Sequence, residues 1–198
     1  MIRPPSSPGA GVIWMRYSTE HKLQTREKLI ASSGALAKRG GFASTGVAEL
    51  MKAVGLTGGA FYNHFPCKDD LFSEIVRREL SNSPLARLAA RGAERQRLAR
   101  CLEQYLSLAH LHNAEQGCPL PPLAVEIARA DQTVRQEAEH WLVVLHAAWS
   151  ETLDDPELAW ALISQCVGAV VVGRMLASET VQSELLQASR SLVAKVLA

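Results

Sequence analysis

The spacing of apolar residues is helical along most of the chain. In the segment 20–39, Leu29, Ile30, Leu36 and Ala37 recur at helical intervals, and Gly40 and Gly41 follow, as glycine does where a helix ends. The same pattern predicts helices at about 47–54, 58–64, 68–80, 93–111, from the prolines at 119–122 to 129, 131–152, 156–177 and 180–197. Strand-like alternation of useful length is absent, so the sequence predicts an all-α fold of about nine helices.

Residues that favour helix starts support these boundaries. Thr57 precedes the predicted helix at 58–64, and Asp131 precedes the one that ends near 152. Asp155 is followed by Pro156; aspartate suits the capping position and proline suits the first helical position. We expect these three side chains to lie at helix N-termini.

The helices at 47–54 and 58–64 meet at the tight turn 54–56, an arrangement typical of a helix-turn-helix. Gly55 allows the turn a positive φ without a Cβ clash. Phe61 and Phe65 are predicted to be buried beneath the second of these helices, which holds its other face at the surface. That face carries small or polar side chains, as entry into a major groove requires; they are Thr57, Gly58, Gly59, Tyr62, Asn63 and His64.

The ordered segment 45–51, then 55–65, then Lys68 and Leu71 resembles the DNA-binding domain of the TetR family of regulators. The resemblance covers about 25–75. It implies an all-helical protein with an N-terminal three-helix helix-turn-helix domain and a C-terminal ligand-binding and dimerisation domain that pairs through its last two helices. The prolines Pro4, Pro5 and Pro8 predict a disordered tail at 1–19. From the resemblance we expect a DNA-binding domain at 20–66 and a ligand-binding domain at 67–198. Met15 is an alternative start.

The resemblance also implies roles for single residues in DNA binding. Tyr62 and His64 correspond to phosphate contacts, as does Lys68 at the start of the fourth helix. Thr45 and Thr57 correspond to hydroxyl contacts with phosphate. Each has a plainer alternative: Tyr62 only packs, His64 stabilises a turn, and Lys68 is a solvated charge.

We expect the start of the helix predicted at 58–64, the recognition helix of the helix-turn-helix, to contact the bases. Thr57, Gly58 and Gly59 lie nearest the bases in the implied arrangement. Gly58 and Gly59 depart from the family pattern, in which many relatives place a lysine before the glycine, so Asn63 is a second candidate for reading a base. Gly46 replaces the usual hydroxyl cap opposite Glu49, and we expect Thr45 to serve instead.

The C-terminal half is apolar on more than one face. The segment 167–176 is almost wholly apolar, with Gly168 and Gly173 permitting close helix contact. Two such helices from each subunit would form a four-helix dimer interface. Two-fold symmetry would then present two recognition helices to half-sites of a palindromic operator about 34 Å apart.

Polar side chains on these apolar helices are candidates for a pocket that binds a small-molecule inducer. They are Gln104, His110, Cys118, Glu126, Trp141, His146, Trp149, Gln165 and Arg174. For each, a satisfied polar group in the core is the alternative. Arg174 stands apart because a buried guanidinium needs a carboxylate, supplied by Glu126 or by a ligand.

Cys118 lies in the segment 117–127, which resembles part of the C-terminal domain in a TetR subgroup. Some members of that subgroup sense electrophiles or oxidants through a cysteine. A thiolate near a helix N-terminus would react, whereas the alternative is a small buried hydrophobe. His110 and His112 lie on different faces of one helix, so we expect no metal site and no cofactor.

Composition and charge agree with a DNA-binding protein. Residues 1–82 hold 11 Lys/Arg and 7 Asp/Glu, a balance of +4, whereas residues 83–198 hold 10 and 13, a balance of −3. The apolar stretch 161–177 is interrupted by Gln165 and Arg174, which favours a cytoplasmic protein over a membrane protein. His140 with Glu137, and His146 with Trp149, lack the third group that catalysis requires, so no catalytic residue is predicted.

The sequence thus predicts a homodimeric repressor that a small molecule releases from operator DNA. The alternatives are a helical adaptor that no longer binds DNA, and a regulator that senses electrophiles or oxidants through Cys118.

Overall fold

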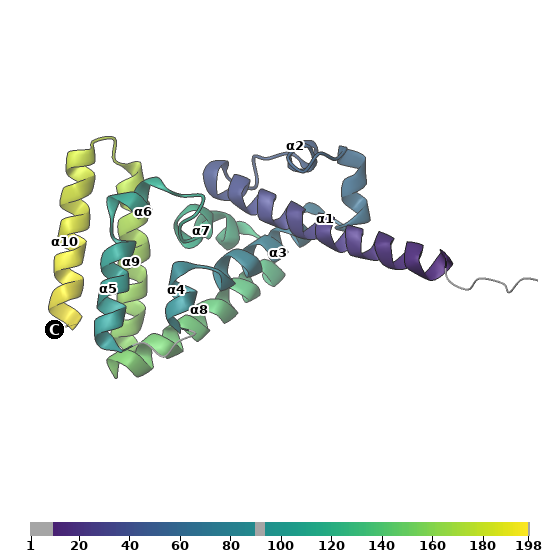
Figure 1. Cartoon of the computed structure of the whole chain (residues 1–198). Helices are drawn as coiled ribbons and strands as arrows, with labels where there is room; N and C mark the ends of the chain where they lie inside the picture. The colour runs from purple at the N-terminus through teal and green to yellow at the C-terminus, as the bar shows by residue number, and fades with distance from the viewer. Residues whose placement is uncertain (1–9, 90–93, 198) are drawn as a thin grey trace, which may run out of the picture.

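The computed structural model describes residues 10–89 and 94–197 of the chain (Figure 1). Within these ranges it contains ten α-helices, one 3₁₀-helix and no strand. The predicted all-α class is confirmed, with eleven helices in place of about nine.

Four elements form the N-terminal end of the elongated molecule (Figure 1). They are α1 (Ala10–Gly40), α2 (Val47–Lys52), the 3₁₀-helix η1 (Gly58–Asn63) and α3 (Lys68–Ser81). Helix α1 contacts both α2 and α3, and α2 packs on η1. The turns before α2 and before η1 contain Gly41 at φ +88° and Gly55 at φ +76°, a backbone region that strains a residue with a Cβ.

The remaining seven helices form the C-terminal part. They are α4 (Pro84–Ala89), α5 (Arg95–Tyr105), α6 (Leu108–His112), α7 (Leu120–Arg129), α8 (Gln132–Leu153), α9 (Pro156–Met175) and α10 (Glu179–Leu197). Helices α5, α9 and α10 stand side by side at the end opposite α2, while α8 runs diagonally beneath α3 (Figure 1). Because α3 packs against α8 as well as α1, one hydrophobic core runs through both parts, from Leu29 to Leu197.

Two of the predicted caps are confirmed. The side chain of Asp131 accepts a hydrogen bond from the amide of Val134, and that of Asp155 accepts one from Leu158. Thr57 occupies the N-terminal position of η1, but its side chain makes no capping bond. Gly46 itself precedes α2, also without a side-chain cap, so the substitute cap expected from Thr45 is wrong.

Two predicted boundaries are corrected. Helix α1 begins at Ala10, so residues 10–19 are helical and the expected tail is wrong there, while residues 1–9 lie outside the described residues. The three prolines all precede Ala10, and the single Gly11 costs a helix only about 1 kcal/mol. The single helix predicted at 93–111 is instead two helices, α5 and α6. The second one begins after Ser107, whose Oγ caps it by accepting a hydrogen bond from the amide of His110.

Candidate DNA-binding surface and core polar cluster

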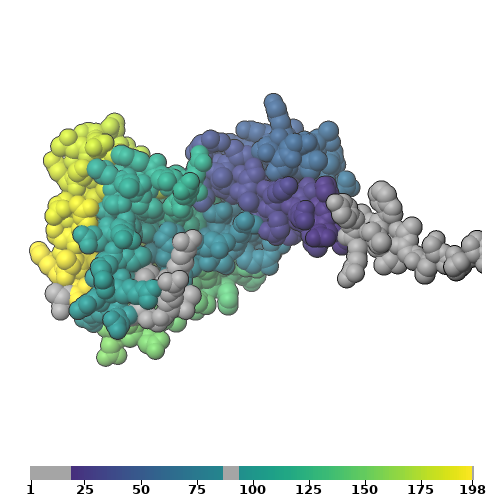
Figure 2. Space-filling model, viewed as in Figure 1, coloured from purple at the N-terminus to yellow at the C-terminus, as the bar shows by residue number. Residues whose placement is uncertain are grey.

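The segment η1 exposes polar groups above two buried aromatic rings. Phe61 and Phe65 are 0% and 2% exposed, as predicted, with ring centroids 5.8 Å apart. Tyr62 is 68% exposed and meets Phe61 edge-on at 5.4 Å. The α2–η1 region, blue in Figure 2, forms a lobe of the surface at the end of the molecule opposite α10, which is yellow. The aromatic pair therefore anchors η1 to the core, and the outer face of η1 is exposed to solvent.

The outer face of η1 carries most of the residues predicted to contact DNA. Thr57, Gly59, Tyr62 and Asn63 are exposed and Gly58 is half-buried. The segment is a 3₁₀-helix rather than the predicted α-helix, in keeping with the low helix propensity of the two glycines that open it.

His64 lies at the end of η1, half-buried. Its Nδ1 atom is buried and has no hydrogen-bond partner. Burial, followed by the charges of Lys22 and Arg26, lowers the pKa of this imidazole. A neutral imidazole would contact phosphate as a single N–H donor rather than as a cation.

Two of the predicted phosphate contacts are engaged inside the protein. Thr45 is buried, and its hydroxyl donates to the carbonyl of Gly41 at 2.9 Å; in this arrangement it cannot reach a phosphate, which corrects that prediction. Lys68 Nζ donates to the carbonyl oxygens of Phe42 and Ala43 at 2.7 and 3.1 Å and lies 4.6 Å from the centre of the Phe42 ring. Its ammonium group thus braces the turn after α1, and its contact with DNA stays a prediction.

Three of the predicted pocket residues meet in the core, and the structure adds a fourth. His110, Cys118 and Arg174 lie together with Tyr105, at the junction of α5, α6, α7 and α9. The rings of His110 and Tyr105 are in contact, with centroids 4.4 Å apart and a tilt of 46°. Tyr105 was missed because it falls on the buried stripe of α5 among leucines, where an aromatic residue reads as core.

The hydrogen bonds of His110 fix its protonation. Nδ1 lies 2.7 Å from the carbonyl oxygen of Tyr105 and must donate, whereas Nε2 accepts from the amide of Cys118 at 3.0 Å. Burial, and then the charge of Arg174, lowers the pKa of this ring. Gly117 allows the approach, because a Cβ there would lie 2.8 Å from His110 Nε2. The imidazole is therefore neutral, with its proton on Nδ1.

Arg174 does not pair with Glu126, so that suggested pairing is wrong. Its Nε and Nη2 donate to the carbonyl oxygens of Leu111 and His110 at 2.9 and 3.3 Å. Arg174 Nη1 is buried without a hydrogen-bond partner, and the hydroxyl of Tyr105, also buried, lies beside the thiol of Cys118. Glu126 instead accepts from two amides of the turn after α1. Among the described residues, no carboxylate forms a salt bridge with Arg174.

The cysteine in this cluster is held as a thiol. Cys118 is 0% exposed, and burial raises its pKa. The hydroxyl of Tyr105 and the nearby Arg174 act in the opposite direction, as smaller contributions. This environment favours the buried-hydrophobe alternative over a reactive thiolate.

The other predicted pocket residues are dispersed. Gln104 is exposed, and Trp141 packs at the edge of the core. His146 Nε2 lies 2.9 Å from the carbonyl of Pro156, and its ring stacks on Trp160 at 4.3 Å. Trp149 is buried with an unpartnered Nε1, and Gln165 donates to Ser189 at 3.4 Å. In the described part of the chain, no group of three or more His, Cys, Asp or Glu side chains is arranged to hold a metal ion.

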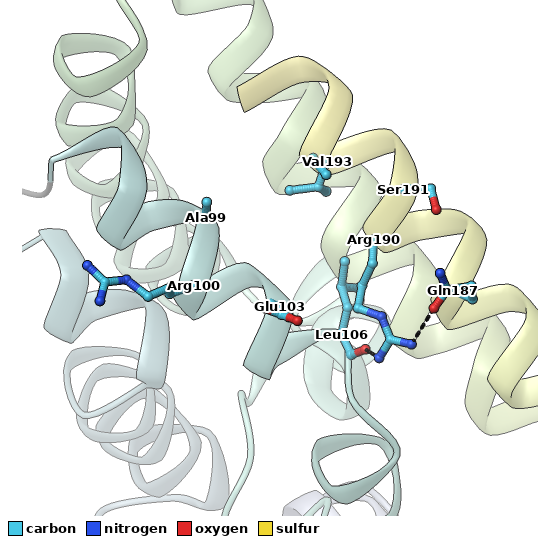
Figure 3. Close-up of a pocket in the computed structure, with 9 residues that line it drawn as sticks. Ala99, Arg100, Glu103, Leu106, Gln187, Arg190, Ser191 and Val193 are labelled. Atoms are coloured by element: carbon cyan, nitrogen blue, oxygen red, sulfur yellow. Dashed lines mark hydrogen bonds between the residues drawn. The ribbon is translucent and has the colours of Figure 1, made fainter. Parts of the chain in front are cut away.

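A separate half-open groove of about 340 Å³ lies between α5 and α10 (Figure 3). Arg190 crosses it, donating to the carbonyl of Leu106 at 3.1 Å and to Gln187 at 2.8 Å. Arg100 and Glu103 of α5 also line it. None of the predicted pocket residues lies there, so the groove and the core cluster are distinct.

Comparisons with known proteins agree with the N-terminal geometry. Residues 29–75 match the family model of bacterial regulatory proteins, tetR family. The HTH-type transcriptional regulator AcrR of Shigella flexneri is 40% identical over 73 residues, a match that spans 37% of this chain and only a third (33%) of AcrR. The HTH-type transcriptional repressor NemR of Escherichia coli K12 is 26% identical over 145 residues, covering 71% of this chain and 72% of NemR.

Solved structures share the fold over most of the chain. The reduced form of E. coli NemR superposes with a TM-score of 0.74 at 22% identity, covering 88% of this chain and 97% of that one. A TetR-family regulator from Agrobacterium tumefaciens gives a TM-score of 0.71 at 18% identity, covering 89% and 100%. Together with the helix-turn-helix described above, these matches show that residues 29–75 form a domain of the bacterial regulatory proteins, tetR family, and that the chain shares its all-helical fold with the solved TetR-family structures.

Proposed function

We propose that the chain is a homodimeric repressor that grips palindromic operator DNA with η1 and releases it when a small molecule binds the C-terminal helices. The observation that carries this proposal is the exposed face of η1 above Phe61 and Phe65. Thr57, Tyr62 and Asn63 on that face offer hydroxyl and amide groups to a groove, with no long aliphatic side chain in the way.

The apolar faces of α9 and α10 support a dimer. Val172 and Met175 on α9 are 46% and 78% exposed, and Val181 and Leu192 on α10 are 43% and 47% exposed. Large apolar side chains gathered on two neighbouring helices indicate a surface that a second copy covers. Two helices from each subunit would then form a four-helix interface.

The composition of helix α9 must also be explained, because it resembles that of a membrane-spanning helix. Among the described residues, Pro156–Met175 is the one helix that is long and apolar enough to cross a bilayer. In the single chain, 39% of its 18-residue apolar stretch is buried. A core helix of a non-membrane protein passes the same test. Burial of its outer face against a partner's α9 accounts for its composition without a membrane.

The core polar cluster is our candidate for the ligand site. Nη1 of Arg174 has no hydrogen-bond partner, the hydroxyl of Tyr105 is a second donor beside the thiol of Cys118, and no carboxylate of the described residues pairs with the guanidinium. Arg174 is half-buried, and a guanidinium that is partly shielded from water without a counter-ion is costly. We infer that the inducer presents a hydrogen-bond acceptor, such as a carboxylate, to this pair.

A second candidate function is sensing of electrophiles or oxidants by Cys118. Its support is the position of this thiol within the core cluster, beside Tyr105 and Arg174. Complete burial and a raised pKa weigh against it. Resistance of the native protein to thiol alkylation at Cys118, measured by mass spectrometry, would exclude this candidate; rapid labelling at Cys118 with loss of DNA binding would favour it.

DNA binding is tested by fluorescence anisotropy with a duplex from the region upstream of the protein's own gene, against a scrambled duplex. We expect a complex that weakens steeply between 50 and 200 mM salt, by about 10³-fold or more, because phosphate contacts release counterions. Arg100→Ala on α5, an exposed cation far from η1, is the control and leaves affinity unchanged. Absence of any complex at low salt would leave the helical adaptor as the better account.

A further inference from the structure

Glu126 of α7 reaches from the C-terminal helices into the DNA-binding domain. Its Oε2 accepts hydrogen bonds from the backbone amides of Phe42 and Ala43, at 2.9 and 3.2 Å. These residues lie in the turn between α1 and α2, more than eighty positions earlier in the sequence. Figure 1 shows α7 beside the C-terminal end of α1. One carboxylate oxygen therefore satisfies two consecutive amides just beyond a helix end.

Gly41 makes room for this carboxylate. It adopts φ +88°, and a Cβ at this position would lie 2.7 Å from Glu126 Oε1. A larger residue would be strained by its backbone and would also push the carboxylate away. Gly41, which follows the last residue of α1, is thus required twice, for the turn and for the approach of Glu126.

The same two residues are held from their other side by Lys68. Its ammonium donates to the carbonyl oxygens of Phe42 and Ala43, and the Phe42 ring stacks on Phe72 of α3 at 4.7 Å with an 11° tilt. The dipeptide therefore has an anion at its amides and a cation at its carbonyls. Both are charge-assisted hydrogen-bonding arrangements, roughly twice as strong as neutral ones.

The turn held in this way leads directly into the helix-turn-helix. Thr45 donates to the carbonyl of Gly41, and Gly46 precedes α2. Helix α2 in turn packs on η1. A shift of the turn would therefore carry both DNA-facing elements with it, while the exposed pair Arg39–Glu115, at 3.4 Å, offers little resistance.

Helix α7 connects this contact to the core polar cluster. Its first residue, Leu120, follows Cys118 by two positions, and Glu126 lies six residues further along. At about 1.5 Å of rise per residue, Glu126 is about 9 Å along the axis from Leu120. A short rigid helix moves as a unit, so a displacement at the cluster reaches the turn.

We propose that Glu126 is the positioning residue through which α7 sets the orientation of the DNA-binding domain. It acts on DNA only through the amides of Phe42 and Ala43, without touching phosphate or base. The inference rests on the proposed DNA binding for its functional consequence, but its structural part is measurable without DNA.

The test compares full-length Glu126→Ala, Glu126→Gln and the matched control Glu115→Gln, which removes the other glutamate that reaches α1. Anisotropy with the upstream duplex should show at least tenfold weaker binding for Glu126→Ala and less than threefold for Glu126→Gln, whose amide oxygen still accepts. Glu115→Gln should bind as the parent protein does. The slope of log Kd against log salt should be unchanged throughout, because no phosphate contact is lost.

Hydrogen–deuterium exchange without DNA provides the second measurement. Glu126→Ala should raise exchange at residues 42–52 and leave α9 and α10 protected. Parent-like protection at 42–52 would overturn the proposal, as would parent-like DNA affinity of Glu126→Ala or a changed salt slope. Faster exchange everywhere would also overturn it, by showing a purely structural role. If the parent protein binds no DNA, the proposed function fails, while the exchange result still decides whether Glu126 holds the turn.

Discussion

Lys38 of α1 and Glu79 of α3 form an ion pair inside the protein, with Nζ 2.6 Å from Oε2 and side chains only 6% and 16% exposed. Unlike the surface pairs, it is shielded from water. We expect Lys38→Met to lower the free energy of unfolding by about 3–5 kcal/mol, because it strands a buried carboxylate. The double variant Lys38→Met, Glu79→Leu should recover most of that loss in urea denaturation. Additive losses would mean that the two groups do not interact.

Tyr62 is expected to contribute to DNA affinity and not to stability. Because its ring is 68% exposed, Tyr62→Ala should change the free energy of unfolding by less than about 0.5 kcal/mol. It should weaken binding to the upstream and scrambled duplexes by a similar factor, as loss of a phosphate contact does. The measurement is anisotropy at fixed salt, and loss confined to one duplex would assign Tyr62 to base reading instead.

Asn63 is expected to read a base. Asn63→Ala should cost about 1–3 kcal/mol for the preferred duplex and relax the preference at one base pair in each half-site. A set of duplexes with single substitutions locates that pair. A uniform loss over every duplex in the set would show that Asn63 only positions the protein on the backbone.

The dimer proposal predicts that charge on α9 separates the subunits. Met175→Asp, at a position 78% exposed in the single chain, should shift sedimentation from dimer to monomer, because an interface would bury an unpaired carboxylate. Val143→Asp on α8, 51% exposed in the single chain, is the control and should leave the dimer intact. The reverse pattern would place the interface on α8.

His110 makes stability depend on pH. Its pKa is lowered in the folded protein, by burial and then by Arg174, and protonation of Nε2 would break the bond from the amide of Cys118. Below about pH 6.5 the unfolded chain therefore binds more protons than the folded one, and stability falls as pH falls through this range. Urea denaturation at pH 7.5 and 5.5 should show the loss, and His110→Gln should reduce it. A loss of the same size in His110→Gln would assign it to another group.

Helix boundaries were predictable wherever a local signal sets them. Asp131, Asp155 and Gly55 mark caps and turns in the sequence, and the structure uses all three as expected. The end of α5 before Ser107 was not predictable, because the apolar periodicity continues across it. The only local signal is Ser107 itself, whose hydroxyl accepts a hydrogen bond from the amide of His110 and caps the next helix.

In the candidate sites too, features set by local spacing were predictable, whereas those set by contacts between distant parts of the chain were not. Burial of Phe61 and exposure of Tyr62 follow from helical spacing and were predicted. The roles of Glu126 and Lys68 depend on contacts with a turn far away in the sequence. No pattern in one chain encodes such contacts. The prediction for Lys68 drew on the family resemblance and the prediction for Glu126 on chemistry alone, and the partner suggested for Glu126 was wrong.

The central claim is that the face of η1 is the surface that meets DNA. Hydrogen–deuterium exchange of the full chain, with and without saturating upstream duplex at low salt, measures this most directly. The account predicts new protection at residues 57–64 and none in the groove between α5 and α10. A stable complex that leaves 57–64 unprotected would contradict it.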